Sequence, residues 1–189
     1  MTVTEDNIIT WRIHPNDMSL IVRMAKAACI GGQSQIRNGQ ERQDALTEDQ
    51  IVGQIGQYVG SMWLFGTANE YKRARWIANQ NPTSGDGGSD LLGANIDFKA
   101  SRVRHRGKDL LSYRLPVRPK ERHVGWVYVL ILVTHMARGE PVIAKMIGWA
   151  MESMLPQQPE MEGVFRGAYT IPARELHPIP PIHWMWTKV

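Results

Sequence analysis

The chain has 189 residues, of which 43% are hydrophobic and 21% charged, and its formal net charge is +4. These values fit one globular domain with a core, and the mild positive charge suits a polyanionic partner without requiring one. The lone cysteine, Cys29, excludes an internal disulfide and a cysteine-based zinc site. The longest apolar run, Val124 to Val133, is too short to span a bilayer, and the N-terminus lacks a signal-peptide pattern. We therefore expect a cytoplasmic protein with no membrane partner.

Helical periodicity dominates the first part of the chain. The first predicted helix covers residues 17–30, and residues 33–46 follow as a polar linker. The second covers residues 47–65 and starts with the capping-box pattern Thr-Glu-Asp-Gln. A third helix, short and basic, follows another capping box and ends before Asn81-Pro82.

The second predicted helix carries glycines in its interior, at Gly53, Gly56 and Gly60. Each glycine costs a helix roughly 0.5–1 kcal/mol relative to alanine. We therefore expect another part of the chain to approach the helix backbone closely at these positions.

From Gly85 onward the pattern alternates with a period of two residues, which is typical of strands. Strands are predicted near residues 89–92, 95–102, 111–117, 124–134 and 141–149, before a short helix and an irregular C-terminal segment. Helices followed by clustered strands predict an α/β fold with a central mixed β-sheet flanked by helices. We expect one domain overall, in which residues 1–46 pack on a core formed by residues 47–189.

Two aspartates are expected to face each other across a hairpin. Gly93-Ala94 suits a two-residue loop, because glycine fits the first central position of a type II′ turn. Counting outward then pairs Asp90 with Asp97, with Cβ atoms about 4.5–5.5 Å apart. Carboxylates this close repel each other, and a divalent cation between them removes the repulsion. Strand alternation puts Lys99 on the same face, beside the expected metal.

A solvated strand face is the alternative interpretation of these residues. Alternating polar side chains usually face water, and Asp97 with Lys99 can form a weak surface ion pair. The spacing alone does not decide between a metal site and a polar surface.

Asp90, followed by Ile96-Asp97-Phe98-Lys99, resembles the PD-(D/E)XK nuclease superfamily, whose fold is that of type II restriction endonucleases. The preceding stretch, Gly85-Asp-Gly-Gly-Ser-Asp90, is similar to the Asp-Gly-Gly-Ile-Asp found in many members. The resemblance covers about residues 47–180, and the tail from Gly167 onward is similar to that of small phage and bacterial members.

The resemblance implies a restriction-endonuclease-like fold and a metal-dependent deoxyribonuclease that hydrolyses DNA phosphodiester bonds. Mg²⁺ is the implied cofactor, with Mn²⁺ able to take its place. Asp90 and Asp97 would bind the metal, and the carbonyl of Phe98 would complete its coordination. Lys99 would position the attacking water or offset developing charge.

In many members an earlier helix carries Gly-Glu, which supplies a further acidic group to the site. The matching place here is Gly56-Gln57, with Gln54 as a lesser candidate. Because Gln57 brings no negative charge, the resemblance predicts weaker metal affinity than in members with the acid, or only one firmly held ion. The alternative is that Gln57 is an ordinary surface residue of the helix.

Basic residues follow Lys99 closely along the chain, at Arg102, Arg104, Arg106 and Lys108. Beside a metal site they suit a DNA backbone, and alone they are an ordinary solvated loop. Many relatives pair to cut both strands, so the resemblance also allows a homodimer. The alternative function is a catalytically weak or inactive nuclease-fold module that binds nucleic acid or a protein partner.

Overall fold

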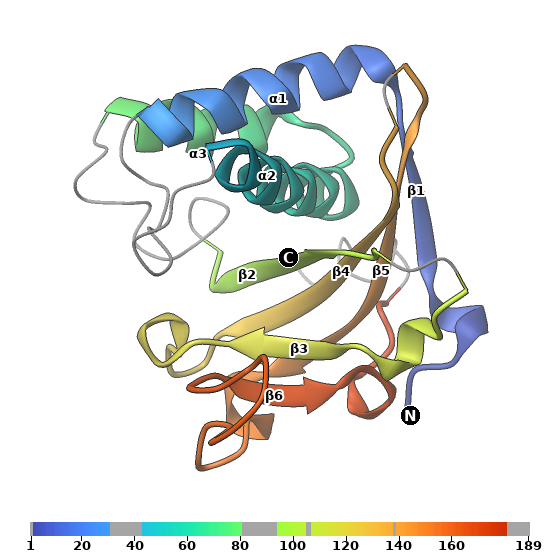
Figure 1. Ribbon diagram of the computed structural model, residues 1–189, viewed down its shortest axis with the longest axis vertical. Coiled ribbons are helices and arrows are strands. Elements are labelled where there is room, and N and C mark those ends of the chain that lie inside the picture. The colour runs from blue at the N-terminus through green and yellow to red at the C-terminus, as the bar shows by residue number, and fades with distance from the viewer. Residues whose placement is uncertain (1, 31–42, 81–93, 105–106, 138, 181–189) are drawn as a thin grey trace.

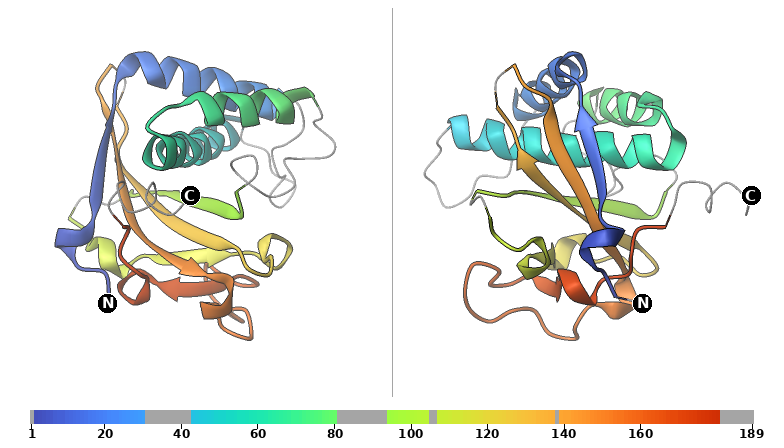
Figure 2. Two further views of the ribbon diagram at one scale, coloured as in Figure 1. Left: turned by 180° about the vertical axis from the view of Figure 1, so that it is seen from behind. Right: turned by 90° about the vertical axis from the view of Figure 1, so that its right-hand side faces the viewer.

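The computed structural model describes residues 2–30, 43–80, 94–104, 107–137 and 139–180. Helices cover one face of a mixed β-sheet, and a small second sheet covers the other (Figures 1 and 2). The helices are α1 (Pro15–Ile30), α2 (Gln43–Phe65) and α3 (Asn69–Gln80). The strands are β1 (Ile9–Ile13), β2 (Ile96–Arg102), β3 (Arg114–Val117), β4 (Val127–His135), β5 (Val142–Met151) and β6 (Tyr169–Pro172). The predicted α/β class with a mixed sheet is confirmed.

Within the described residues, the main sheet has the strand order β1-β5-β4-β2. β2 runs parallel to β4, whereas β4 with β5 and β5 with β1 are antiparallel. β3 and β6 form the second sheet as an antiparallel pair. A parallel pair needs a long crossover connection. The crossover from β2 to β4 contains β3 and the 3₁₀ turn η3 (Pro119–Glu121), and η3 returns to the vicinity of β2.

The central strand β4 is buried on both faces, which explains its continuous apolar sequence. Val129, Ile131 and Val133 pack in the cluster that includes residues of the helices. Their neighbours along the strand pack in the cluster that includes β3 and β6, and these are Tyr128, Leu130 and Leu132. The core therefore has two layers, one on each face of the main sheet.

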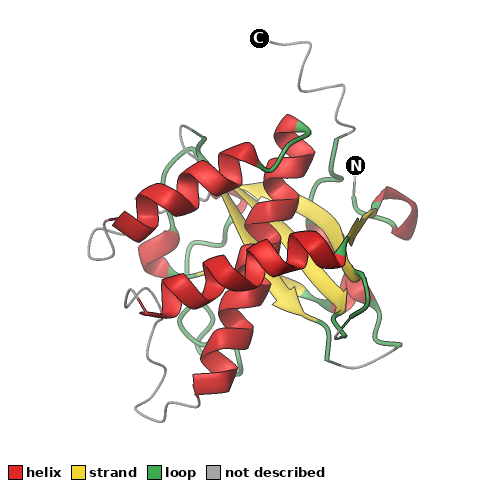
Figure 3. Ribbon diagram, turned by 90° about the horizontal axis from the view of Figure 1, so that it is seen from above, coloured by secondary structure: helices red, strands yellow, loops and turns green. Residues whose placement is uncertain are grey.

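Gly56 and Gly60 allow α2 to lie close against β2, across the face of the sheet seen in Figure 3. A Cβ atom on Gly56 would lie 2.8 Å from the Cβ of Ala100, and one on Gly60 would overlap the ring of Phe98. The predicted close approach is confirmed at these positions. It is wrong for Gly53, where a Cβ would meet nothing within 4 Å.

The predicted element boundaries need correction in several places. α1 begins at Pro15, two residues before the predicted start at residue 17, because proline is preorganised for the first helical position. α2 begins at Gln43, so residues 43–46 are helical and do not belong to a linker. The predicted strand at residues 89–92 lies outside the described residues.

Two short strands were not predicted. β1 adds to β5 at the edge of the main sheet, and β6 pairs with β3. β3 is also shorter than the predicted strand, because Leu110–Ser112 form a 3₁₀ turn. No helix in the described part of the chain has the length and apolar character needed to cross a membrane.

Candidate functional site

Asp97 and Lys99 lie on β2, where Tyr128 and Leu130 of β4 are their register neighbours. Phe98, between them, points the other way and packs against α2. The predicted alternation of this strand is therefore confirmed, and it places the two charged side chains on the face that looks toward β3 and η3.

The ammonium of Lys99 lies between two carboxylates. Its Nζ is 2.6 Å from Oδ2 of Asp97 and 2.8 Å from Oε2 of Glu121. The side chains of Lys99, Asp97 and Glu121 are 15%, 9% and 27% exposed, respectively. A weak ion pair on a solvated strand face does not describe this arrangement, because the charged groups are largely withdrawn from water.

Glu121 was not predicted from the sequence. It lies at the end of η3, 22 residues after Lys99, and reaches the lysine because the crossover returns to β2. The stretch Arg118-Pro-Lys-Glu121 resembles an ordinary charged turn, so no local pattern marks Glu121 as part of a site.

Hydrogen bonds fix Glu121 relative to the sheet. The backbone N–H of Arg118 donates to Oε2 of Glu121 at 3.2 Å. The hydroxyl of Tyr128 donates to the backbone carbonyl of Glu121 at 2.8 Å and accepts from the backbone N–H of His123 at 2.8 Å. Tyr128 is fully buried on β4, the strand that pairs with β2. Its hydrogen bonds therefore fasten η3 to the main sheet.

The electrostatics keep these groups charged. Burial is the largest single influence on the pKa of both Lys99 and Glu121 and opposes their ionisation, but the combined attraction of their charged and hydrogen-bonding partners outweighs it. The charges of Asp97 and Glu121 raise the pKa of Lys99 above its usual value. The ammonium of Lys99, assisted by the N–H of Arg118, lowers the pKa of Glu121. At neutral pH the site therefore holds an ammonium and ionised Glu121.

A cleft of about 670 Å³ lies beside this cluster. Its wall includes residues 48–53 of α2, the end of β2, η3 and the loop between β5 and β6. The charged residues described along the wall are Glu48, Asp49, Arg102, Arg104, Arg118 and Glu121. Three arginines and three carboxylates balance, so this set has no net formal charge. Arg102 is paired with Glu48. Arg104, two residues later in the wall, is exposed to solvent.

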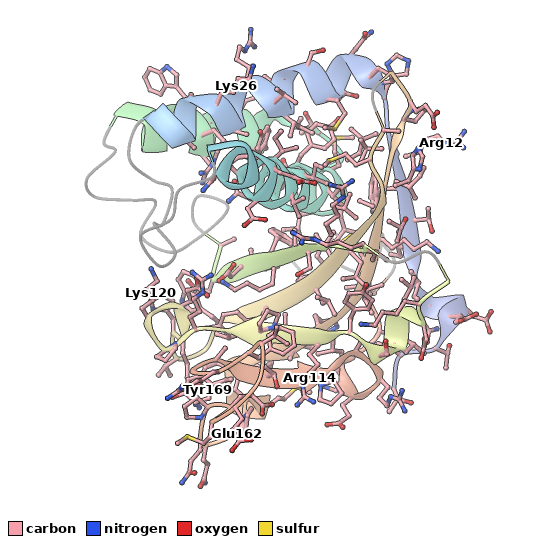
Figure 4. The ribbon with its side chains drawn as sticks, viewed as in Figure 1. Arg12, Lys26, Arg114, Lys120, Glu162 and Tyr169 are labelled. Atoms are coloured by element: carbon pink, nitrogen blue, oxygen red, sulfur yellow. The ribbon has the colours of Figure 1, made fainter. Side chains whose placement is uncertain are left out.

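The other predicted residues divide into those near this cleft and those outside it. Arg102 and Arg104 line the cleft, whereas Lys108 lies over the ring of Tyr113, with Nζ 4.7 Å from its centroid. Arg106 lies outside the described residues. Figure 4 shows Lys120 of η3 at the edge of the molecule beside the connection to β4.

The described residues include only some of the metal ligands that the resemblance implies. Asp90 lies outside the described residues, so its pairing with Asp97 stays a prediction. A Cβ atom on Gly56 would lie 3.7 Å from the carbonyl oxygen of Phe98, so that carbonyl lies close to α2. Within the described part of the chain, no group of three or more His, Cys, Asp or Glu residues could hold a metal.

Gln57 lies on α2 between the glycines that contact β2, and it is buried with 9% of its surface exposed. Gln57 is therefore not in bulk solvent, and its predicted approach to the metal ligands stays a prediction. The lesser candidate, Gln54, is 3% exposed, and its side-chain oxygen has no hydrogen-bond partner in the described structure.

Comparison with protein-family models, with curated proteins and with solved structures finds no match to this chain.

Proposed function

We propose that this protein is a metal-dependent deoxyribonuclease that hydrolyses DNA phosphodiester bonds at the cluster around Lys99. The observation that carries the proposal is the burial of Lys99 and Asp97 side by side on one strand, next to a cleft with arginines in its wall. A buried ammonium and carboxylate cost solvation free energy, and such charges are common at sites of function.

Two neighbouring oxygen groups on β2 would serve as ligands of a hard divalent cation. Carboxylate and carbonyl oxygens are its preferred ligands, and Asp97 and the carbonyl of Phe98 offer them from neighbouring positions of β2. Asp90 would add a second carboxylate. When bound, Mg²⁺ or Mn²⁺ would polarise the phosphate and lower the pKa of a water.

The protein's own side chains have separate roles in this proposal. Lys99 presents an ammonium that orients the attacking water or offsets the charge that develops on the phosphate. Arg104 and Arg102 bind the DNA backbone beside the cleft, which contributes affinity without sequence preference.

The test is incubation with linear, circular, branched and single-stranded DNA, with Mg²⁺, with Mn²⁺ and with a chelator. We expect cleavage by the parent protein that requires the metal and is lost in Asp97→Asn. Asp6→Asn, which makes the same chemical change at an exposed position of η1 (Glu5–Asn7), is the control. Equal cleavage by the two variants would show that any nuclease activity comes from elsewhere.

A non-catalytic module that binds nucleic acid or a protein partner is the second candidate. Two observations favour it: Gln57 replaces the acid found in many nucleases of the family it resembles, and Lys99 is already neutralised by Asp97 and Glu121. Calorimetric titration with Mn²⁺ separates the candidates, because a module without a metal site should release no heat of binding.

A further inference from the structure

Asp97, one of the two partners of Lys99, is also the residue that would bind the metal under the proposed function. Asp97 accepts from the ammonium at 2.6 Å, but under the proposed function the same carboxylate also binds a divalent cation. A bound cation would attract the carboxylate and repel the ammonium. Lys99 would then depend on Glu121, whose Oε2 is 2.8 Å from Nζ.

We propose that Glu121 is a positioning residue that keeps Lys99 in the site when Asp97 engages a divalent cation. This inference rests on the proposed function and deepens it, because it explains how a lysine beside a metal ligand stays next to a residue that lines the cleft. Glu121 lines that cleft and so holds the ammonium at its boundary, where a DNA phosphate would bind.

Glu121 is suited to this role because it is itself held in place. Its carboxylate accepts from the N–H of Arg118, and its backbone carbonyl accepts from the hydroxyl of buried Tyr128. Tyr128 is the register neighbour of Asp97 on the paired strand. The anchor of Lys99 is therefore connected to the sheet independently of Asp97.

A purely structural role for Glu121 makes a different prediction, and the chain offers a matched control. Glu152 pairs with Arg122, the residue after Glu121, at 2.6 Å between Oε1 and Nε. That ion pair also fastens the segment before β4. If Glu121 only fastened this segment, replacing Glu121 and replacing Glu152 would affect Lys99 alike.

The first measurement is the acetylation rate of Lys99 by an N-hydroxysuccinimide ester, followed by peptide mass spectrometry with a chelator and with Mn²⁺. In Glu121→Ala with Mn²⁺ we expect acetylation about tenfold faster than in the parent, because the remaining hydrogen bond to a charged group is lost. Glu121→Gln retains an acceptor oxygen and should lie closer to the parent. Glu152→Gln should match the parent.

The second measurement is DNA cleavage at saturating Mg²⁺. Glu121→Ala should lower kcat by about tenfold to a hundredfold with KM nearly unchanged, because a misplaced catalytic group costs rate and not binding. Glu121→Gln should recover most of the loss. Thermal melting of each variant confirms that it is folded under the assay conditions.

The two measurements separate this inference from the proposed function. If the parent cleaves no DNA, the proposed function fails, and the acetylation rates still decide whether Glu121 holds Lys99. If Mn²⁺ exposes Lys99 equally in the parent and in Glu121→Ala, Glu121 is not the anchor and the inference is overturned. It is also overturned if Glu152→Gln exposes Lys99 as much as Glu121→Ala does.

Discussion

Replacing Gly60 by alanine tests how closely α2 lies against the strand that carries the candidate site. The new Cβ atom would overlap the edge of the Phe98 ring, which is 4% exposed and packed in the core between α2 and the sheet. Because the ring is surrounded by core side chains, relieving the overlap requires a shift of the ring and its neighbours, of the helix or of β2.

The magnitude follows from two opposing effects. Alanine stabilises a helix interior by about 0.5–1 kcal/mol relative to glycine. Overpacking a core costs about 1–3 kcal/mol. We expect the second effect to dominate, with a net loss of about 1–2 kcal/mol in the free energy of unfolding. For a chain of this size, that loss lowers Tm by roughly 2–8 °C.

Gly53→Ala is the matched control, because it lies on the same helix and its Cβ would meet nothing within 4 Å. Here only the helix effect acts, so we expect stabilisation by about 0.5–1 kcal/mol. Urea unfolding followed by circular dichroism measures both variants. If Gly60→Ala is as stable as Gly53→Ala, the close packing of α2 on β2 is wrong.

Further predictions concern charge. The pKa of Glu121 is lowered, so its ionised form contributes stability above its usual pKa of 4.5, and this contribution is lost as the pH falls through the folded-state value. The difference in urea stability between Glu121→Gln and the parent should therefore be smaller below pH 4.5 than at neutral pH. Asp97→Asn should lower the free energy of unfolding by about 1–3 kcal/mol in chelator, because buried Lys99 loses one carboxylate. Arg104→Gln should reduce the salt dependence of DNA affinity by about one unit of slope, and more than Arg102→Gln, because Arg102 is already paired.

The parts of the fold that the sequence predicts well are those with long or strongly periodic patterns. α2, β4 and β5 were expected near their observed places because each buries many apolar side chains in a regular period. β6 gives little signal, since it has four residues and ends at Pro172, and its partner β3 contains Pro116. Proline weakens the case for a strand because it cannot donate to the ladder.

The candidate site also has a part that the sequence predicts and a part that it does not. Asp97 and Lys99 are two residues apart on one strand, so the period of two alone places them on one face. Glu121 joins them through a parallel crossover, and nothing in the local sequence specifies that β2 pairs with β4 or that η3 folds back. Contacts that depend on such long connections require the tertiary structure.

The two faces of β2 link the packing of the protein to its proposed chemistry. On one face Phe98 and Ala100 fit against the glycines of α2, and on the other face Lys99 and Asp97 are held with Glu121. Burying an ammonium costs several kcal/mol unless charged partners compensate, which is why one carboxylate on each side of Lys99 is consistent with a stable fold. Apolar residues of similar volume could fill the same space at less cost, so folding alone does not require these charges. Buried charges of this kind beside a cleft are therefore consistent with the chemistry that we propose.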